Sequence, residues 1–140
     1  MLVVVVVMLV LAAMLLASLR DMQREVERVL VATDVQSLRT ELQLAVASAI
    51  NRGQEAELQG WPNRNPLEIA GRTQTAVPGD GAGSGGRWVW VAEMRVLRYE
   101  YADGSGLSLR VVRAGPEIRE AWGLGGGLLL VSEPSSARQR

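Results

Sequence analysis

The chain opens with an uninterrupted apolar run. Residues 2–19 carry no charge, and Ser18 is the single polar side chain among them. A segment that crosses a bilayer is helical and needs roughly 20 apolar residues, because no water is present there to satisfy its backbone groups. The run therefore predicts a transmembrane anchor over residues 1–19. A buried helix of a soluble protein is disfavoured by the missing polar face, and a cleaved secretory signal by the missing basic segment and A-x-A-like site.

Helical spacing continues past the apolar run. Met22, Val26, Val29 and Thr33 follow one another at steps of four, three and four, and a second stripe runs from Val31 to Ala49. Gly53 after Arg52 is a typical helix stop. We expect an extramembrane continuation over residues 20–53 and a helix about 75 Å long. Its packing residues against a sheet are predicted to be Leu38, Leu42, Val46 and Ile50.

The remaining pattern predicts a Pro- and Gly-rich stretch followed by strands. Residues 54–86 contain two X-Pro turns and the Gly-rich segment 79–86, and are expected to be irregular. Residues 87–132 are expected to form a small antiparallel β domain, with strands at 87–91, 94–101 and 107–113 and a weaker one at 128–132. Residues 123–127 and the tail 133–140 are expected to be flexible. The predicted fold class is α+β, a long N-terminal helix packed on a small antiparallel sheet.

Alternation along the strands indicates which side chains face the helix. Leu97 and Tyr99 fall on one face together with Tyr101, while charged residues occupy the opposite face. Trp88 and Trp90 also share a strand face. They are interpreted as core residues or, with Tyr101, as a possible interface, since aromatic residues are enriched at interfaces.

Composition argues against several classes of function. The 15 basic residues, all Arg, balance 15 acidic ones. The chain therefore has no net positive charge whose electrostatic field would attract nucleic acid. Cys and His are both absent, which removes a thiolate nucleophile, the commonest general base and the commonest metal ligands. The glycines between Gly81 and Gly86 match G-x-G-x-x-G formally, but they lead into a strand rather than a helix. We expect no enzyme activity, cofactor, metal site or small-molecule substrate.

The order of these features resembles that of type IV pilins and pseudopilins, in particular short accessory proteins of MSHA-type pili and type II secretion systems. The resemblance rests on the apolar start, the charged turn at Glu25, the Gly53 stop, Asn65-Pro66-Leu67, and the segments GRWVW and LRY that begin at Gly86 and Leu97. Pilins usually carry a Glu near the fifth position of the mature helix, where this chain has Val5.

The resemblance implies a membrane-anchored structural component of a pilus or secretion system. Its partners would be the lipid bilayer and other pilin-like or secretion subunits, with the C-terminal domain in the periplasm. The Arg residues that follow the apolar run, Arg20, Arg24 and Arg28, favour the opposite orientation when taken alone. Two alternatives stay open: a single-span envelope adaptor that uses the stripe from Val31 to Ala49 as a short coiled coil, and a small secreted β domain.

Overall fold

The computed structural model describes residues 1–72, 86–116, 118 and 121–135. Contacts divide the chain into two compact units, residues 1–33 and residues 34–140. Helix α1 (Leu2–Asn51) supplies the first unit from Leu2 onward and the first element of the second. Each unit is described separately below.

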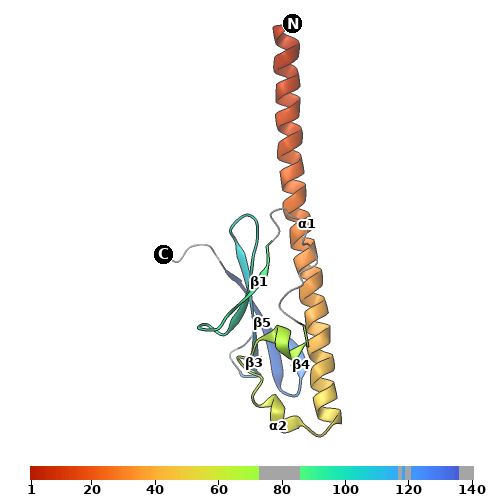
Figure 1. The fold of residues 1–140 in the computed structure, drawn as a ribbon, viewed down its shortest axis with the longest axis vertical. Coiled ribbons are helices and arrows are strands. Elements are labelled where there is room, and N and C mark those ends of the chain that lie inside the picture. The colour runs from red at the N-terminus through yellow and green to blue at the C-terminus, as the bar shows by residue number, and fades with distance from the viewer. Residues whose placement is uncertain (73–85, 117, 119–120, 136–140) are drawn as a thin grey trace. The chain divides into compact units, whose positions relative to one another are not determined.

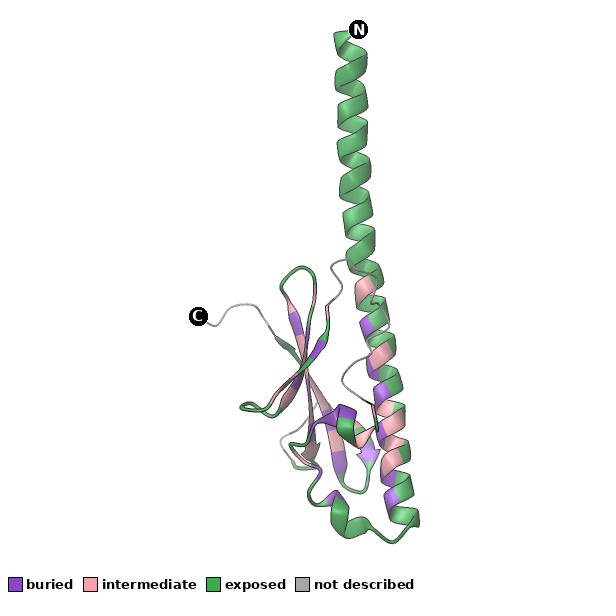
Figure 2. Ribbon diagram, viewed as in Figure 1, coloured by how far each residue is buried: buried purple, intermediate pink, exposed green. Residues whose placement is uncertain are grey.

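The first unit is helical from Leu2 onward. The side chains of residues 1–26 are all exposed, as Figure 2 shows by their uniform colour. Most of them up to residue 19 are large and apolar. A helix that is apolar on every side, and that no other described residue covers, is suited to a lipid environment.

The C-terminal end of α1 is closed by a glycine, as its sequence predicts. Gly53 has a positive φ of 71°, and its backbone N–H donates to the carbonyl of Ile50 at 3.0 Å. The N–H of Gln54 donates to the carbonyl of Ala49 at 2.9 Å. This pair of bonds is the Schellman arrangement, which satisfies carbonyls that the last helical turn leaves free.

The second unit contains a five-stranded antiparallel sheet (Figure 1). Its strands are β1 (Trp88–Val91), β2 (Val96–Glu100), β3 (Gly106–Arg113), β4 (Ala121–Gly125) and β5 (Leu128–Ser135), in the spatial order β1-β2-β3-β5-β4. Leu97 pairs with Leu109 and Tyr99 with Leu107, so the apolar positions of β2 and β3 share one face. The sequence predicts a five-residue turn at 102–106 between these strands; in the structure it occupies residues 101–105, because Gly106 already belongs to β3.

The part of α1 that belongs to the second unit packs on this face of the sheet. The buried helix positions follow steps of three and four: Val35, Leu38, Leu42, Val46 and Ala49. The sheet contributes side chains with almost no exposed surface, including Leu97, Leu109, Val111, Leu128 and Leu130. Burial of such side chains stabilises a fold by about 1.5–3 kcal/mol each, so this layer is the core.

Two short helices lie in the stretch that was expected to be irregular. They are α2 (Glu55–Leu58) and α3 (Pro66–Ile69). Asn65 caps α3 by accepting a hydrogen bond from the N–H of Leu67 at 3.1 Å, and Pro66 occupies the first helical position. The interpretation of Asn65-Pro66 as a turn is thus refined to a helix start. The predicted Gly-rich loop at 79–86 lies, except for Gly86, outside the described residues.

The prediction of a flexible segment at 123–127 is wrong for residues 123–125, which form a strand, whereas Gly126 and Gly127 make the turn that follows it. Gly123 and Gly125 belong to β4, which pairs with β5 around a β-bulge, and Leu124 between them is buried. The strand is also tied to α1, because the side chain of Gln43 donates to the carbonyl of Gly123 at 2.9 Å. The predicted fourth strand is β5, which continues to Ser135 into the expected tail; residues 136–140 lie outside the described ranges.

Candidate functional site: the apolar helix and the helix–sheet interface

Helix α1 is long and apolar enough to cross a membrane. An 18-residue window near its N-terminus meets this test and has none of its surface buried. Among the residues that the structure describes, it is the one helix that does so. The complete exposure argues against the alternative of a buried core helix, whose side chains would be covered by other elements.

The structure places five of the six predicted packing residues in the core. Leu38, Leu42 and Val46 are each 1% exposed on α1, and Leu97 and Tyr99 are buried on the sheet. Ile50 differs, because 39% of its surface is exposed. At 100° per residue it lies about 80° from the centre of the buried stripe, and Ala49 takes the inward position in its place.

The aromatic residues divide between core and surface. Trp88 is 8% exposed and packs edge-on against Tyr99, with ring centroids 5.2 Å apart. Trp88 is therefore a core residue and does not offer a free interface. Trp90 and Tyr101 are half-buried, and Tyr101 packs edge-on against Tyr99 at 5.2 Å.

A network of charges that the sequence analysis did not identify joins α1 to the segment after α3. The guanidinium of Arg72 donates to the Glu41 carboxylate through Nε at 2.6 Å and one terminal nitrogen at 2.7 Å. Its other terminal nitrogen donates to Oδ1 of Asp34 at 2.8 Å. The indole N–H of Trp88 donates to the second oxygen of Asp34 at 2.7 Å. Two segments that are distant in sequence, one at Arg72 and one at Trp88, thus meet on one face of α1.

The electrostatics of this network follow from its geometry. The hydrogen bonds from Arg72 hold the pKa of the Glu41 carboxyl below its ordinary value, against the effect of burial. The same bonds raise the pKa of Arg72. A two-point guanidinium–carboxylate pair is strong and fixes orientation. The network therefore positions the start of β1 and the end of the α3 segment on the helix.

The spacing of Asp34 and Glu41 could have indicated from the sequence that these two carboxylates belong to a charge network. Asp34 and Glu41 are seven residues apart, which places them on the same side of a helix next to the buried positions Val35 and Leu42. Charges at such positions need a partner when they are half-buried. The identity of that partner, Arg72, depends on the course of the chain after α3, which periodicity does not provide.

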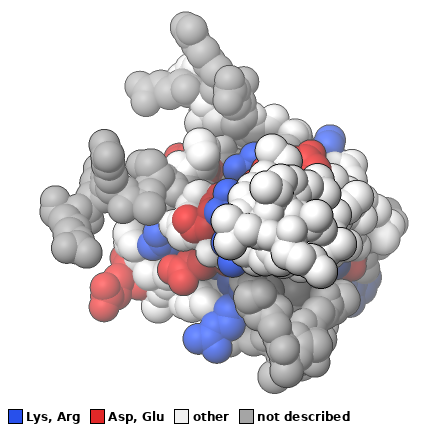
Figure 3. All heavy atoms as spheres, turned by 90° about the horizontal axis from the view of Figure 1, so that it is seen from above, with Lys and Arg blue, Asp and Glu red and all other residues white. Residues whose placement is uncertain are grey.

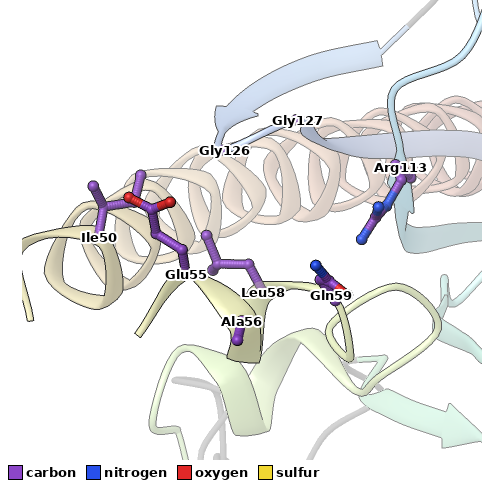
Figure 4. A pocket seen from close by; sticks show the side chains of 8 residues that line it. All are labelled: Ile50, Glu55, Ala56, Leu58, Gln59, Arg113, Gly126 and Gly127. Atoms are coloured by element: carbon purple, nitrogen blue, oxygen red, sulfur yellow. The ribbon is translucent and has the colours of Figure 1, made fainter. Parts of the chain in front are cut away.

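The second unit has an open hollow among its described residues. No group of three acidic side chains there could hold a metal ion. An open hollow of about 580 Å³ is lined by Ile50, Glu55, Ala56, Leu58, Gln59, Arg113, Gly126 and Gly127 (Figure 4). Its charged lining residues are Glu55 and Arg113.

The exposed charges are mixed in sign. On the face drawn in Figure 3, basic and acidic side chains lie interspersed among uncharged ones. On the face of the sheet turned away from α1, Arg110 and Glu133 form an ion pair at 3.5 Å beside half-buried apolar residues such as Val112 and Val131. Charges of both signs therefore lie close together on these faces.

Comparison with known proteins identifies no relative. No protein-family description, no curated protein and no solved structure matches the chain at a significant level.

Proposed function

We propose that this chain is a membrane-anchored structural subunit of a pilin-like assembly, either a type IV pilus of the MSHA type or a type II secretion system. It acts through packing and not through catalysis. The apolar part of α1 sits in the bacterial inner membrane beside similar helices, and the sheet faces neighbouring subunits in the periplasm. The observation that carries the proposal is the course of α1, which is apolar and uncovered at its start and part of a sheet core at its end.

The burial of the stripe from Val31 to Ala49 supports this proposal over the alternative of an adaptor that works through a coiled coil. Val35, Leu38 and Leu42 would be the contact positions of such a coil, and all three are buried against the sheet of their own chain. A second helix could reach them only if the sheet were displaced. The sheet also matches the antiparallel β domain that the resemblance implies.

The experiment uses single cysteines, because the chain contains none of its own. Cysteines placed one at a time over residues 2–19 of the full chain in bacterial cells should crosslink to other membrane helices. The chain itself should stay in the membrane after alkaline carbonate extraction. Recovery of the intact chain in the soluble fraction, or crosslinks to none of the pilus and secretion subunits under conditions that trap known ones, would contradict the proposal.

The side of the membrane is tested separately with Glu93→Cys, since Glu93 is exposed in the turn between β1 and β2. A membrane-impermeant maleimide should label it in intact spheroplasts. Leu97→Cys is the matched control, because Leu97 has no exposed surface and should react after denaturation only. Labelling of Glu93→Cys that requires lysis would place the domain in the cytoplasm, as the Arg count favours, and exclude a periplasmic subunit.

A further inference from the structure

Arg39 carries a positive charge that has no ion-pair partner among the residues that the structure describes. Its guanidinium lies over the Trp122 ring, with the central carbon 5.8 Å from the ring centroid. The Nε of Arg39 is buried and makes no hydrogen bond. The side chain as a whole is half-buried, and Nε is its one nitrogen that is both buried and unbonded, so the terminal nitrogens are open to solvent. A planar guanidinium held on an aromatic ring in this way is a preformed binding group for a carboxylate.

The acidic side chains of the same helix do not neutralise Arg39. Glu41 lies about 160° around α1 from Arg39 at 100° per residue, on the other side of the buried stripe. There it pairs with Arg72 at 2.6 Å. The charges on that side are therefore satisfied within the chain, whereas the charge of Arg39 is not. A half-buried charge without a partner costs stability in the isolated chain, and a ligand that supplies a carboxylate offsets this cost.

The strand that lies beside Arg39 forms an edge of the sheet. Strand β4 is last in the strand order, and β5 is its one partner among the described strands. Gln43 donates to the carbonyl of Gly123 at 2.9 Å, so this carbonyl points away from β5. Because backbone groups alternate along an antiparallel ladder, those of Ala121 also point away from β5, whereas those of Trp122 point toward it. The backbone groups of Ala121 and the N–H of Gly123 thus form an edge to which a further strand can be added.

We propose that Arg39 and the edge of β4 together bind an extended acidic segment of another protein. The segment adds as a strand beside β4, and a Glu or Asp side chain opposite Trp122 pairs with Arg39. Trp122 faces α1, because its ladder partner Leu130 is buried in the core. Since the backbone groups of Trp122 point toward β5, its new pair is of the non-hydrogen-bonded kind, in which side chains lie closest together. The carboxylate therefore meets the guanidinium beside the same ring. This inference goes beyond the proposed function and does not depend on the membrane anchor.

Fluorescence anisotropy of a labelled heptapeptide, titrated with the full chain in non-ionic detergent micelles, tests the proposal. In the probe, Val, Glu and Val alternate with Thr, so that Glu is central and shares one face with both Val side chains; a second peptide has Gln in place of Glu. Arg39→Gln removes the cation, and Arg64→Gln is the matched control at an exposed arginine. Ala121→Pro removes the N–H of the first residue of β4, where Pro is tolerated because this N–H points away from β5.

We expect the Glu peptide to bind the unchanged chain and Arg64→Gln equally, and to bind Arg39→Gln and Ala121→Pro about ten-fold more weakly, as the loss of one charged hydrogen bond or strand contact implies. The Gln peptide should bind the unchanged chain about ten-fold more weakly too, and this comparison requires no variant to fold. Equal binding of the two peptides, undiminished binding to Ala121→Pro, or no binding of the Glu peptide would overturn the proposal. Displacement of the peptide by an equal concentration of inorganic phosphate would overturn it as well, because it indicates a general anion site. These outcomes leave the proposed function intact, since membrane extraction tests that separately.

Discussion

Truncation of Leu42 tests whether the end of α1 is held by the sheet. Leu42 is 1% exposed at the centre of the helix–sheet layer. Leu42→Ala removes three carbon atoms, worth about 2.4 kcal/mol of transfer free energy at ~0.8 kcal/mol per methylene. A cavity that relaxes only in part adds about 1 kcal/mol or more, so a loss of about 3–4 kcal/mol in the free energy of unfolding is expected.

Leu44→Ala is the matched control, because Leu44 lies two residues away on the same helix and is 65% exposed. Leu and Ala have similar helix propensities, so this change should alter the free energy of unfolding by less than about 0.5 kcal/mol. Urea unfolding of the full chain in mild detergent, followed by tryptophan fluorescence, measures both variants. Equal effects, or a loss below about 1 kcal/mol at Leu42, would refute the packing and favour a helix free to form a coiled coil.

Two further predictions concern the charge network and a tight turn. Because the pKa of Glu41 in the folded chain is below its ordinary value of 4.5, the stability it contributes is present above pH 4.5 and is lost as the pH falls below it. Glu41→Gln should therefore cost about 1 kcal/mol at pH 7, after allowance for its partial exposure, and progressively less as the pH is lowered below 4.5; a cost that does not change with pH would contradict the pairing with Arg72. Gly126 has φ +59°, and a Cβ there would lie 2.9 Å from Cδ1 of Leu58, whereas Gly127 has φ +76° with open space around it. Gly126→Ala should lower the unfolding midpoint more than Gly127→Ala, which carries the backbone strain alone, and equal shifts would show that Leu58 moves aside freely.

The secondary-structure elements that depend only on nearby residues could be predicted from the sequence. The long helix, its stop at Gly53 and the strand pair around residues 101–105 all depend on spacing or on one turn residue. The inward side of the helix could also be predicted for Leu38, Leu42 and Val46, because a stripe of several turns fixes its own phase. Ile50 was misplaced because it lies at the edge of that stripe, where neighbouring Ala49 fits the close approach to the sheet.

Features that depend on tertiary structure could not be predicted in this way. The segment of β4 reads as a flexible loop, since Gly123 and Gly125 have no side chains to form an alternating pattern. Its strand conformation comes from pairing with β5 and from the bond to Gln43. The network around Arg72 joins residues 31 to 54 positions apart in the chain, and no periodicity connects them.

The sheet topology has a consequence for synthesis of the chain. Strands β1, β2 and β3 pair with their sequence neighbours, as do β4 and β5, so these hairpins can form soon after each is made. The buried residues of α1, in contrast, have all been synthesised once Ala49 is added, whereas the sheet residues that bury them extend as far as Leu130. At a synthesis rate of about 5–20 residues per second, roughly 4–16 seconds pass between the addition of Ala49 and that of Leu130. During that time the apolar face of the nascent helix is exposed and can be bound by holdase chaperones or by adjacent chains.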